Sequence, residues 1–439
     1  MVDHSVDTPN RLKSPDQNRR TAPDRFGDQI HAVLGMNRID IQCAGPSEHR
    51  CIPRFLTSRA VTRSVATGQV GFGFHAPTTG EQRQRDDGQK TAAATTASIP
   101  NRSADLLRHP HGTDFVLHHS SKQTYRARWL MPIDEAPIPN GMMIVDSGVI
   151  ASIGSFQDSK IEGELIDLED VAILPGLVNA HTHLEFSDLA KPVGHAGMEL
   201  ADWIREVITT RGMVDHQTRQ QSVLRGHGEA IASGTQLIAD IVTTPMETIP
   251  PNTIAFAEVL GLSQERGDER MAQAEEHLAN NASPDSRWDV AAISPHAPYS
   301  TPLPLIERCV QIAKQLNTTL AMHVAESPAE RELLSNGSGP FADSLRTLGL
   351  PVETFFPWTE VNPISHLIQL LSKSPRALIV HGNDLTESEI EQVKSHPNCS
   401  IVYCPRTHHF FQHSKHPVAE LLAAGINVAI GTDSRASNP

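Results

Sequence analysis

The feature that most constrains how this chain can fold is a short apolar run, residues 173–180, that leads directly into His181-Thr182-His183. A run of this length is typical of a buried strand, and side chains two residues apart on a strand lie on the same face. His181 and His183 are therefore predicted to bind one divalent metal ion together. Because an isolated His-x-His more often has no ligand role, this interpretation depends on the rest of the chain.

Strand-like and helix-like segments alternate from residue 173 onward. The predicted strands are residues 177–181, 235–240, 253–260, 290–295, 319–323, 378–381, 401–403 and 428–433. The predicted helices between them are residues 199–210, 217–233, 303–316, 364–372 and 418–424. This rhythm indicates parallel strands with helical crossovers, and eight strands favour a closed (β/α)8 TIM barrel. The alternative is an open doubly wound sheet, but no Gly-x-Gly-x-x-Gly opens a helix as its dinucleotide-binding members require.

Titratable side chains fall where five of these strands end. Because a barrel brings the carboxyl ends of its strands to one mouth, they are predicted to converge there. Three neutral imidazoles and one carboxylate suit a divalent transition metal ion with an open position for water. The residues concerned are His181, His183, His296, His323, Glu326, His381 and Asp433, and the predicted ligands are His181, His183, His323 and Asp433.

Such an ion lowers the pKa of its water and supplies hydroxide near neutral pH. Glu326, three residues after His323, is placed to carry a proton without binding the metal. Its alternative role is a surface carboxylate at the start of the next helix, where the helix dipole favours it. His381 is predicted to orient the attacking water or to polarise the electrophile. The predicted catalytic residues are therefore Glu326, His381 and, through the metal, Asp433.

Composition and missing motifs narrow the function classes. The net charge of −14 argues against nucleic acid as a general partner, and neither a membrane-spanning run nor a signal peptide is visible. The five cysteines are unpatterned, so we expect a reducing, cytoplasmic location. The motifs of helix-borne zinc proteases, nucleic-acid-type zinc deaminases and serine hydrolases are incomplete or missing.

Residues 1–124 differ from the rest of the chain. They contain no Trp or Tyr and carry 16 Lys+Arg against 12 Asp+Glu, whereas residues 125–439 carry 21 against 39. They show no sustained period of 2 or 3.6 residues, so little apolar surface offsets their chain entropy. We expect this extension to be disordered and to contribute nothing to catalysis. Order is predicted to begin near Tyr125, with strands at residues 125–130, 142–145, 149–153 and 164–168.

These motifs resemble the amidohydrolase superfamily, in its cytosine-deaminase-like and chlorohydrolase-like branch. They occur in family order within the part of the chain from Tyr125 to Pro439. The motifs are residues 175–184 (Pro-Gly-Leu-Val-Asn-Ala-His-Thr-His-Leu), 294–300 (Ser-Pro-His-Ala-Pro-Tyr-Ser), 323–327 (His-Val-Ala-Glu-Ser), 404–406 (Cys-Pro-Arg) and 431–438 (Gly-Thr-Asp-Ser-Arg-Ala-Ser-Asn).

The resemblance implies a barrel with one metal ion, zinc or iron, beside a small β-sandwich built from both chain ends. Residues 125–172 would form the N-terminal part of the sandwich and residues 173–439 the hydrolase barrel, incomplete at its C-terminal end. The predicted metal ligands match the family's ligand positions, Glu326 its proton shuttle and His381 its orienting histidine. His296 and Ser437 match substrate-holding positions of purine-deaminating relatives. With His296 in place of a lysine on the fourth strand, a two-metal centre with a carboxylated lysine looks excluded.

Residues 183–187, Trp203-Ile204 and residues 207–211 resemble deaminases of adenosine-type metabolites, the aminodeoxyfutalosine deaminases among them. The expected function is therefore hydrolytic deamination of an aminopurine-type small molecule. The sequence does not determine the oligomeric state, and a homo-oligomer is compatible with it. One alternative is a chlorohydrolase of a halogenated nitrogen heterocycle. Another is an inactive, truncated relative, because the family pattern continues past the last strand and this chain stops at Pro439.

Overall fold

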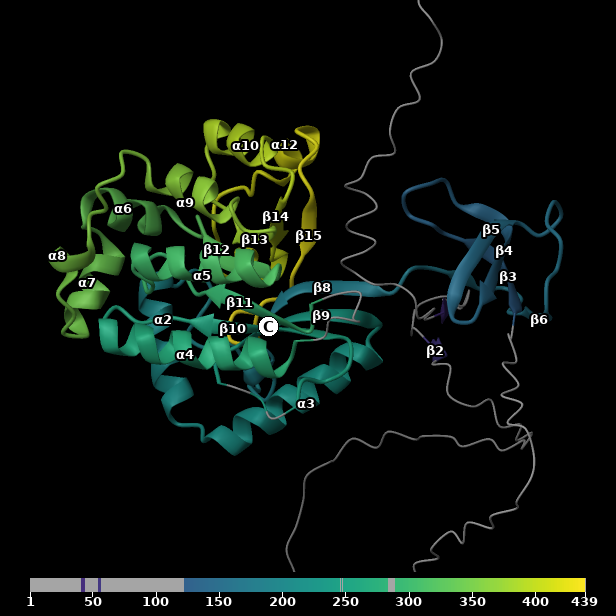
Figure 1. Ribbon diagram of the computed structural model, residues 1–439, viewed down its shortest axis with the longest axis horizontal. Helices are drawn as coiled ribbons and strands as arrows, with labels where there is room; N and C mark the ends of the chain where they lie inside the picture. Colours follow the sequence, from purple (N-terminus) through teal and green to yellow (C-terminus); the bar gives the residue numbers. More distant parts are fainter. Residues whose placement is uncertain are drawn as a thin grey trace, which may run out of the picture. The chain divides into compact units, whose positions relative to one another are not determined.

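The computed structural model describes residues 41–43, 54–56, 122–244, 246, 248–282 and 289–438. The first two segments are short strands, β1 (Ile41–Cys43) and β2 (Arg54–Leu56), which pair antiparallel. Most of residues 1–124 lies outside the described residues, so the disorder expected there stays a prediction. The other described elements form two further sheets with their helices (Figure 1).

The smaller of these sheets contains the four strands predicted after Tyr125 and a short fifth one. Its order is β5-β4-β3-β6, with β7 paired to β3. Its core consists of Ala127, Leu130, Met143, Val145 and Ile173. The strands are β3 (Gln123–Leu130), β4 (Ile138–Asp146), β5 (Val149–Ser155), β6 (Glu164–Asp167) and β7 (Ala172–Ile173).

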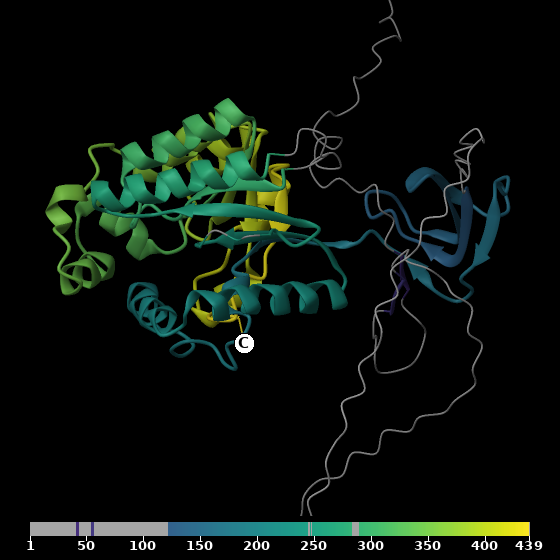
Figure 2. The ribbon, with the colours of Figure 1, turned by 60° about the horizontal axis from the view of Figure 1, so that its bottom comes forward.

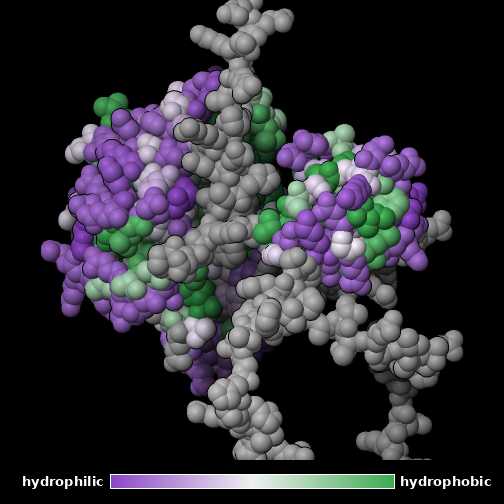
Figure 3. All heavy atoms as spheres, turned by 45° about the vertical axis from the view of Figure 1, so that its right-hand side comes forward, coloured by the Kyte–Doolittle hydropathy of each residue, from purple (hydrophilic) through white to green (hydrophobic). Residues whose placement is uncertain are grey.

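Several apolar side chains of this small sheet remain at the surface. Val149, Ile150 and Ile153 of β5 and Leu165 of β6 are each more than two-fifths exposed. Figure 3 shows apolar patches among polar ones on the body that carries this sheet. The described residues thus provide one layer of the expected sandwich.

Eight parallel strands form the larger sheet and follow one another in chain order. The last returns to the first, because Thr182 bridges Asp433 and the carbonyl of His181 accepts the N–H groups of Thr432 and Asp433. The predicted (β/α)8 barrel is confirmed as a nearly closed one. Its strands are β8 (Leu177–Thr182), β9 (Thr235–Val242), β10 (Thr253–Val259), β11 (Ala291–Pro295), β12 (Thr319–Val324), β13 (Arg376–His381), β14 (Cys399–Tyr403) and β15 (Val428–Ile430).

Helices cover the outside of these strands, and Figure 2 shows green helices on one side of them and teal helices on the other. None of the described helices is long and apolar enough to cross a membrane. All five predicted helices are confirmed. The helical elements are η1 (Leu184–Phe186), α2 (Leu200–Gly212), α3 (His216–Ala232), α4 (Gln264–Asn280), α5 (Leu303–Leu316), α6 (Pro328–Asn336), α7 (Pro340–Thr347), α8 (Val352–Phe355), α9 (Pro363–Leu371), α10 (Glu387–Lys394), α11 (Pro405–Phe410) and α12 (Val418–Ala423).

Alternate residues of each barrel strand serve two different cores. On β10, Ile254 and Phe256 belong to the cluster that fills the barrel interior. Ala257 and Val259 belong to the cluster between the strands and the helices. This alternation directs Glu258, the last residue of the inward-facing set on β10, toward the barrel interior.

Candidate metal centre and active site

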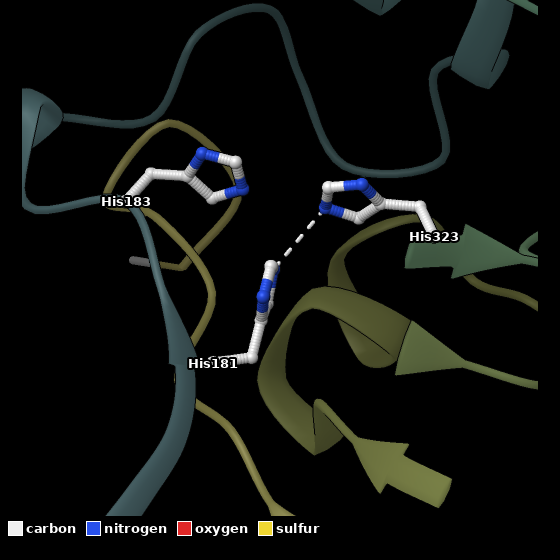
Figure 4. A group of neighbouring side chains, drawn as sticks. All are labelled: His181, His183 and His323. Carbon is white, nitrogen blue, oxygen red and sulfur yellow. Dashed lines mark hydrogen bonds between the residues drawn. The ribbon is translucent and has the colours of Figure 1, made fainter. Parts of the chain in front are cut away.

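Three of the predicted ligands converge at the carboxyl ends of the barrel strands. His181 lies on β8, His183 directly follows it, and His323 lies near the end of β12. Each offers a nitrogen within 4.8 Å of those of the other two, and Figure 4 shows the rings gathered around one point. The Nε2 atoms of His181 and His323 are only 3.3 Å apart.

Asp433, just beyond β15, brings a carboxylate to the same point. Its Oδ1 atom lies 3.8 Å from Nε2 of both His181 and His183. Ligand atoms of a tetrahedral zinc site are about 3.3–3.6 Å apart when the bonds are about 2.0–2.2 Å long. The separations among these four side chains are therefore close to those that a single ion of this kind requires.

The chemistry of the donor set also fits a metal ion. Burial holds the pKa values of His181 and His183 well below their usual range, and lowers the pKa of His323 to about 4. The imidazoles are therefore neutral, as metal ligands must be. Nδ1 of His323 donates to the carbonyl of His296 at 2.6 Å, which leaves its Nε2 lone pair directed at the cluster. Burial raises the pKa of Asp433 to about 6, and a nearby cation favours its charged form.

Glu326 and His381 lie beside this cluster. Glu326 is buried, unlike the surface carboxylate that was its alternative interpretation. Its Oε1 atom is 3.5 Å from Nε2 of His381, and a second overlapping group of potential ligands contains His181, His381 and Asp433. Burial, reinforced by the charges of Asp433 and Glu330, raises the pKa of Glu326 well above its usual range. A raised pKa makes a carboxylate a stronger proton acceptor than an ordinary one, as a general base requires.

The backbone is strained at three of these strand ends. Ala325, His381 and Asp433 have φ values of 53°, 73° and 56°, in the left-handed region that residues other than glycine rarely adopt. Strain of this kind persists only where the surroundings hold it, and it is concentrated at functional sites. Each of the three positions is a candidate catalytic or ligand residue or directly precedes one.

A buried carboxylate that the sequence analysis missed supports one of these strand ends. Glu330, in the first turn of α6, accepts the N–H groups of Ala325 at 2.7 Å and Glu326 at 3.2 Å. Asn383 donates its side-chain amide to the carbonyl of Glu326 at 2.9 Å. The spacing of four residues between two glutamates at a helix start was the only sequence signal for this contact.

We expect Glu330→Gln to reduce turnover by up to about 10²-fold while the metal stays bound, because a displaced catalytic group loses rate steeply. Since Glu330 contacts the backbone of Glu326, its effect should largely vanish in a Glu326→Gln background. Glu389→Gln is the matched control, since Glu389 is equally buried but binds Arg331 and Thr386 instead. Steady-state kinetics of the single and double variants measure this coupling; additive losses would contradict it.

The two predicted substrate-binding residues have different surroundings. The ring of His296, which follows β11, is partly exposed, and its Nδ1 atom lies 2.6 Å from Oγ of Ser300. Burial lowers the pKa of His296 to about 4, so this ring is neutral. Ser437 is fully buried, and its hydroxyl group contacts Thr407 at 2.9 Å and Asp433 at 3.4 Å. In this structure Ser437 lies against the carboxylate of Asp433, a candidate ligand, and its contact with substrate stays a prediction.

Another polar group at the mouth was missed. Glu185, two residues after His183, accepts from Arg211 at 3.1 Å and from Thr243 at 2.8 Å. Asp240, buried near the end of β9, accepts the N–H group of Leu184 at 2.8 Å. The backbone that follows the His-x-His pair is thus held by a buried carboxylate, as it is at Glu326.

Comparison with known proteins identifies the family of this chain and several deaminases that resemble it. The profile described as "Amidohydrolase family" matches residues 172–439. Aminodeoxyfutalosine deaminase of Deinococcus radiodurans is 29% identical over 60% of this chain and 64% of its own length. A 5-methylthioadenosine/S-adenosylhomocysteine deaminase of Halalkalibacterium halodurans is 27% identical over 69% of this chain and 67% of its own length. The chain thus spans about two thirds of the length of these curated relatives.

Solved structures give the same fold. Helicobacter pylori aminofutalosine deaminase, in complex with methylthio-coformycin, matches 72% of this chain and 78% of its own chain, with a TM-score of 0.58 and 21% identity. An adenosine deaminase from Xanthomonas campestris with bound zinc matches 72% of this chain and 70% of its own, with a TM-score of 0.55 and 23% identity. At these identities the likeness concerns the barrel architecture alone.

Proposed function

This chain belongs to the amidohydrolase family, and from that premise we propose that it is a metal-dependent hydrolase that deaminates the adenine ring of a nucleoside-type metabolite. The observation that carries the proposal is the convergence of His181, His183, His323 and Asp433 beside a buried Glu326 at the mouth of the barrel. The names of the relatives support the substrate class, because they include deaminases of 5-methylthioadenosine and 5'-deoxyadenosine.

The four converging side chains would hold one divalent ion, for which we propose zinc. Two neutral imidazole nitrogens only 3.3 Å apart support a shared cation at this point, and their N/O donor set suits zinc. When bound, the ion supplies a water molecule acidic enough to act as a nucleophile near neutral pH. Iron remains the alternative, and metal analysis distinguishes the two.

The reaction joins the oxygen of water to the amino-bearing ring carbon, breaks the carbon–nitrogen bond and releases ammonia. We assign Glu326 the proton transfers: it takes a proton from the water and passes it to a ring nitrogen. It then takes the second proton of the same oxygen and delivers it to the departing amine, which leaves as ammonia. His381, 3.5 Å from Glu326, is neutral because burial lowers its pKa well below the usual range, so it can orient the water by hydrogen bonding.

We further propose a reducing, cytoplasmic setting and a small-molecule substrate. Cys309, Cys399 and Cys404 are free and buried in the described part of the chain, as suits reducing conditions.

The proposal is tested by incubating zinc-loaded protein with 5-methylthioadenosine, 5'-deoxyadenosine, adenine, guanine and a chlorotriazine. We expect ammonia release from at least one adenine nucleoside, measured with a coupled assay and by the spectral change of the purine. Chloride release from the triazine without ammonia release from any purine would favour the chlorohydrolase alternative. Metal-loaded, folded protein without either activity would reject the deaminase assignment.

A further inference from the structure

Glu258 is a buried carboxylate that neither the metal centre nor the proposed proton transfers use. Its residue is 7% exposed, and the alternation along β10 directs it into the barrel beside Ile254 and Phe256. Within the described part of the chain, no donor forms a hydrogen bond with this carboxylate. Nε2 of His296 lies 3.9 Å from it, beyond hydrogen-bonding distance, and Arg270, which lines the same small cavity, interacts with its charge.

A second buried polar group without a partner lies on the neighbouring strand. Ser294 of β11 is aligned with Glu258 in the parallel pairing of the two strands, and it is fully buried. Ala292, two residues earlier, belongs to the barrel interior, so Ser294 also faces inward. Its Oγ atom has no hydrogen-bond partner among the described residues. Buried polar groups are rarely left unpaired, because the loss of hydration is not compensated.

The order of the strands places this pair beside the metal cluster but not within it. The ligands lie at the ends of β8, β12 and β15, whereas Glu258 and Ser294 lie on β10 and β11. His296 stands between the two groups: its ring centroid is 5.0 Å from that of His323, and its Nε2 atom is 3.9 Å from Glu258. A substrate whose reacting atom lies at the cluster can therefore extend past His296 toward Glu258.

The chemistry of an adenine nucleoside limits which of its groups Glu258 can bind. A carboxylate accepts hydrogen bonds, whereas the unsubstituted ring nitrogens of a neutral adenine nucleoside are themselves acceptors. The donors of such a molecule are the ring amino group and the sugar hydroxyls. Because the amino group must lie at the cluster to be replaced, the sugar hydroxyls are the donors left for Glu258.

We propose that Glu258, assisted by Ser294, forms a subsite for the sugar hydroxyl groups of the substrate. The inference rests on the proposed deaminase function and adds to it a basis for selecting nucleosides over free bases. Carboxylates bind ribose hydroxyls in the same way in dinucleotide-binding proteins. The Ser294 hydroxyl, which both donates and accepts, can complete the contact with a second sugar oxygen.

The first test compares 5'-deoxyadenosine with its analogue that lacks the 2'- and 3'-hydroxyls. Hydrogen bonds to a charged group are strong enough that Glu258→Ala should lower kcat/KM for 5'-deoxyadenosine by roughly 10–100-fold. The same substitution should leave kcat/KM for the analogue nearly unchanged. The ratio of the two kcat/KM values, which measures the preference for the hydroxylated substrate, should therefore fall toward one. Glu258→Gln, which keeps the side-chain shape, and Ser294→Ala should each cause a smaller loss of that preference.

Glu265→Gln is the matched control, because it removes a carboxylate from an exposed position near the start of α4. It should retain the full preference. Circular dichroism shows whether each variant is folded, and metal analysis shows whether it is loaded. If Glu258→Ala fails to fold, Glu258→Gln is used as the test variant in its place. Unchanged preference in a folded Glu258 variant that still deaminates 5'-deoxyadenosine would overturn this inference and leave the deaminase proposal intact.

A second readout needs no turnover. Calorimetric titration of both nucleosides into metal-loaded Glu326→Gln protein, with and without Glu258→Ala, measures binding directly. We expect the hydroxylated nucleoside to lose affinity on Glu258→Ala while the analogue does not. Equal losses for both nucleosides would overturn the subsite. Failure of the parent protein to bind or deaminate either nucleoside would overturn the deaminase proposal and this inference together.

Discussion

Replacing either His323 or Asp433 by alanine should remove the bound metal ion and abolish measurable turnover. Each residue provides one of four atoms that converge at the mouth of the barrel. Loss of even an outer partner of a ligand typically costs about 10–100-fold in metal affinity or activity, so loss of a ligand itself should cost more. Plasma mass spectrometry of purified protein gives the metal-to-protein ratio, which should fall from near one to near zero.

The matched control for the histidine is His216→Ala, at the exposed first position of α3. It should keep both metal and activity. The variants should also remain folded, because His323 and Asp433 lie at strand ends rather than in the hydrophobic clusters. Unchanged metal content in His323→Ala and Asp433→Ala would show that the assigned ligand set is wrong.

The sequence predicted the barrel and the candidate ligands because both depend on local patterns that repeat. The position of His181 and His183 on one side of the site follows from strand geometry, and their meeting with His323 follows from parallel strands that end at one mouth. No knowledge of side-chain contacts was needed for either step. The same reasoning could not determine how far β15 extends: it ends at Ile430, and Asp433 has a φ of 56°, outside the extended region of a regular strand.

The features that were missed depend on tertiary contacts. Helix α4 is rich in charged residues, and only a narrow stripe that includes Met271, Ala274 and Leu278 is buried, so its periodicity was weak. Glu330 resembles an ordinary helix-start carboxylate until the structure places it against the backbone of Glu326. Glu258 likewise reads as the polar end of a strand, and only the alternation within the folded barrel directs it inward.

Glu326→Gln should lower turnover by about 10²–10⁴-fold, the usual contribution of a general acid–base group. Glutamine keeps the size and the hydrogen-bonding capacity of the side chain but cannot take a proton from water. The Nε2 atom of His381 lies 3.5 Å from the carboxylate, so the variant can keep this contact through its amide oxygen. Metal content should therefore stay near one ion per chain, and KM should change much less than kcat.

This pattern separates a proton carrier from a residue that merely shapes the site. A structural role would raise KM or lower metal content together with the rate, whereas a proton carrier affects the rate alone. Glu332→Gln, at an exposed position of α6, the helix that follows Glu326, removes an equal charge and should leave kcat unchanged. Burial raises the pKa of Glu326, so this carboxyl group should contribute a titration to the pH–rate profile of the wild-type protein. That titration should be missing from the pH–rate profile of Glu326→Gln. Near-normal kcat in metal-loaded Glu326→Gln would assign the proton transfers to another group, such as His381 at 3.5 Å.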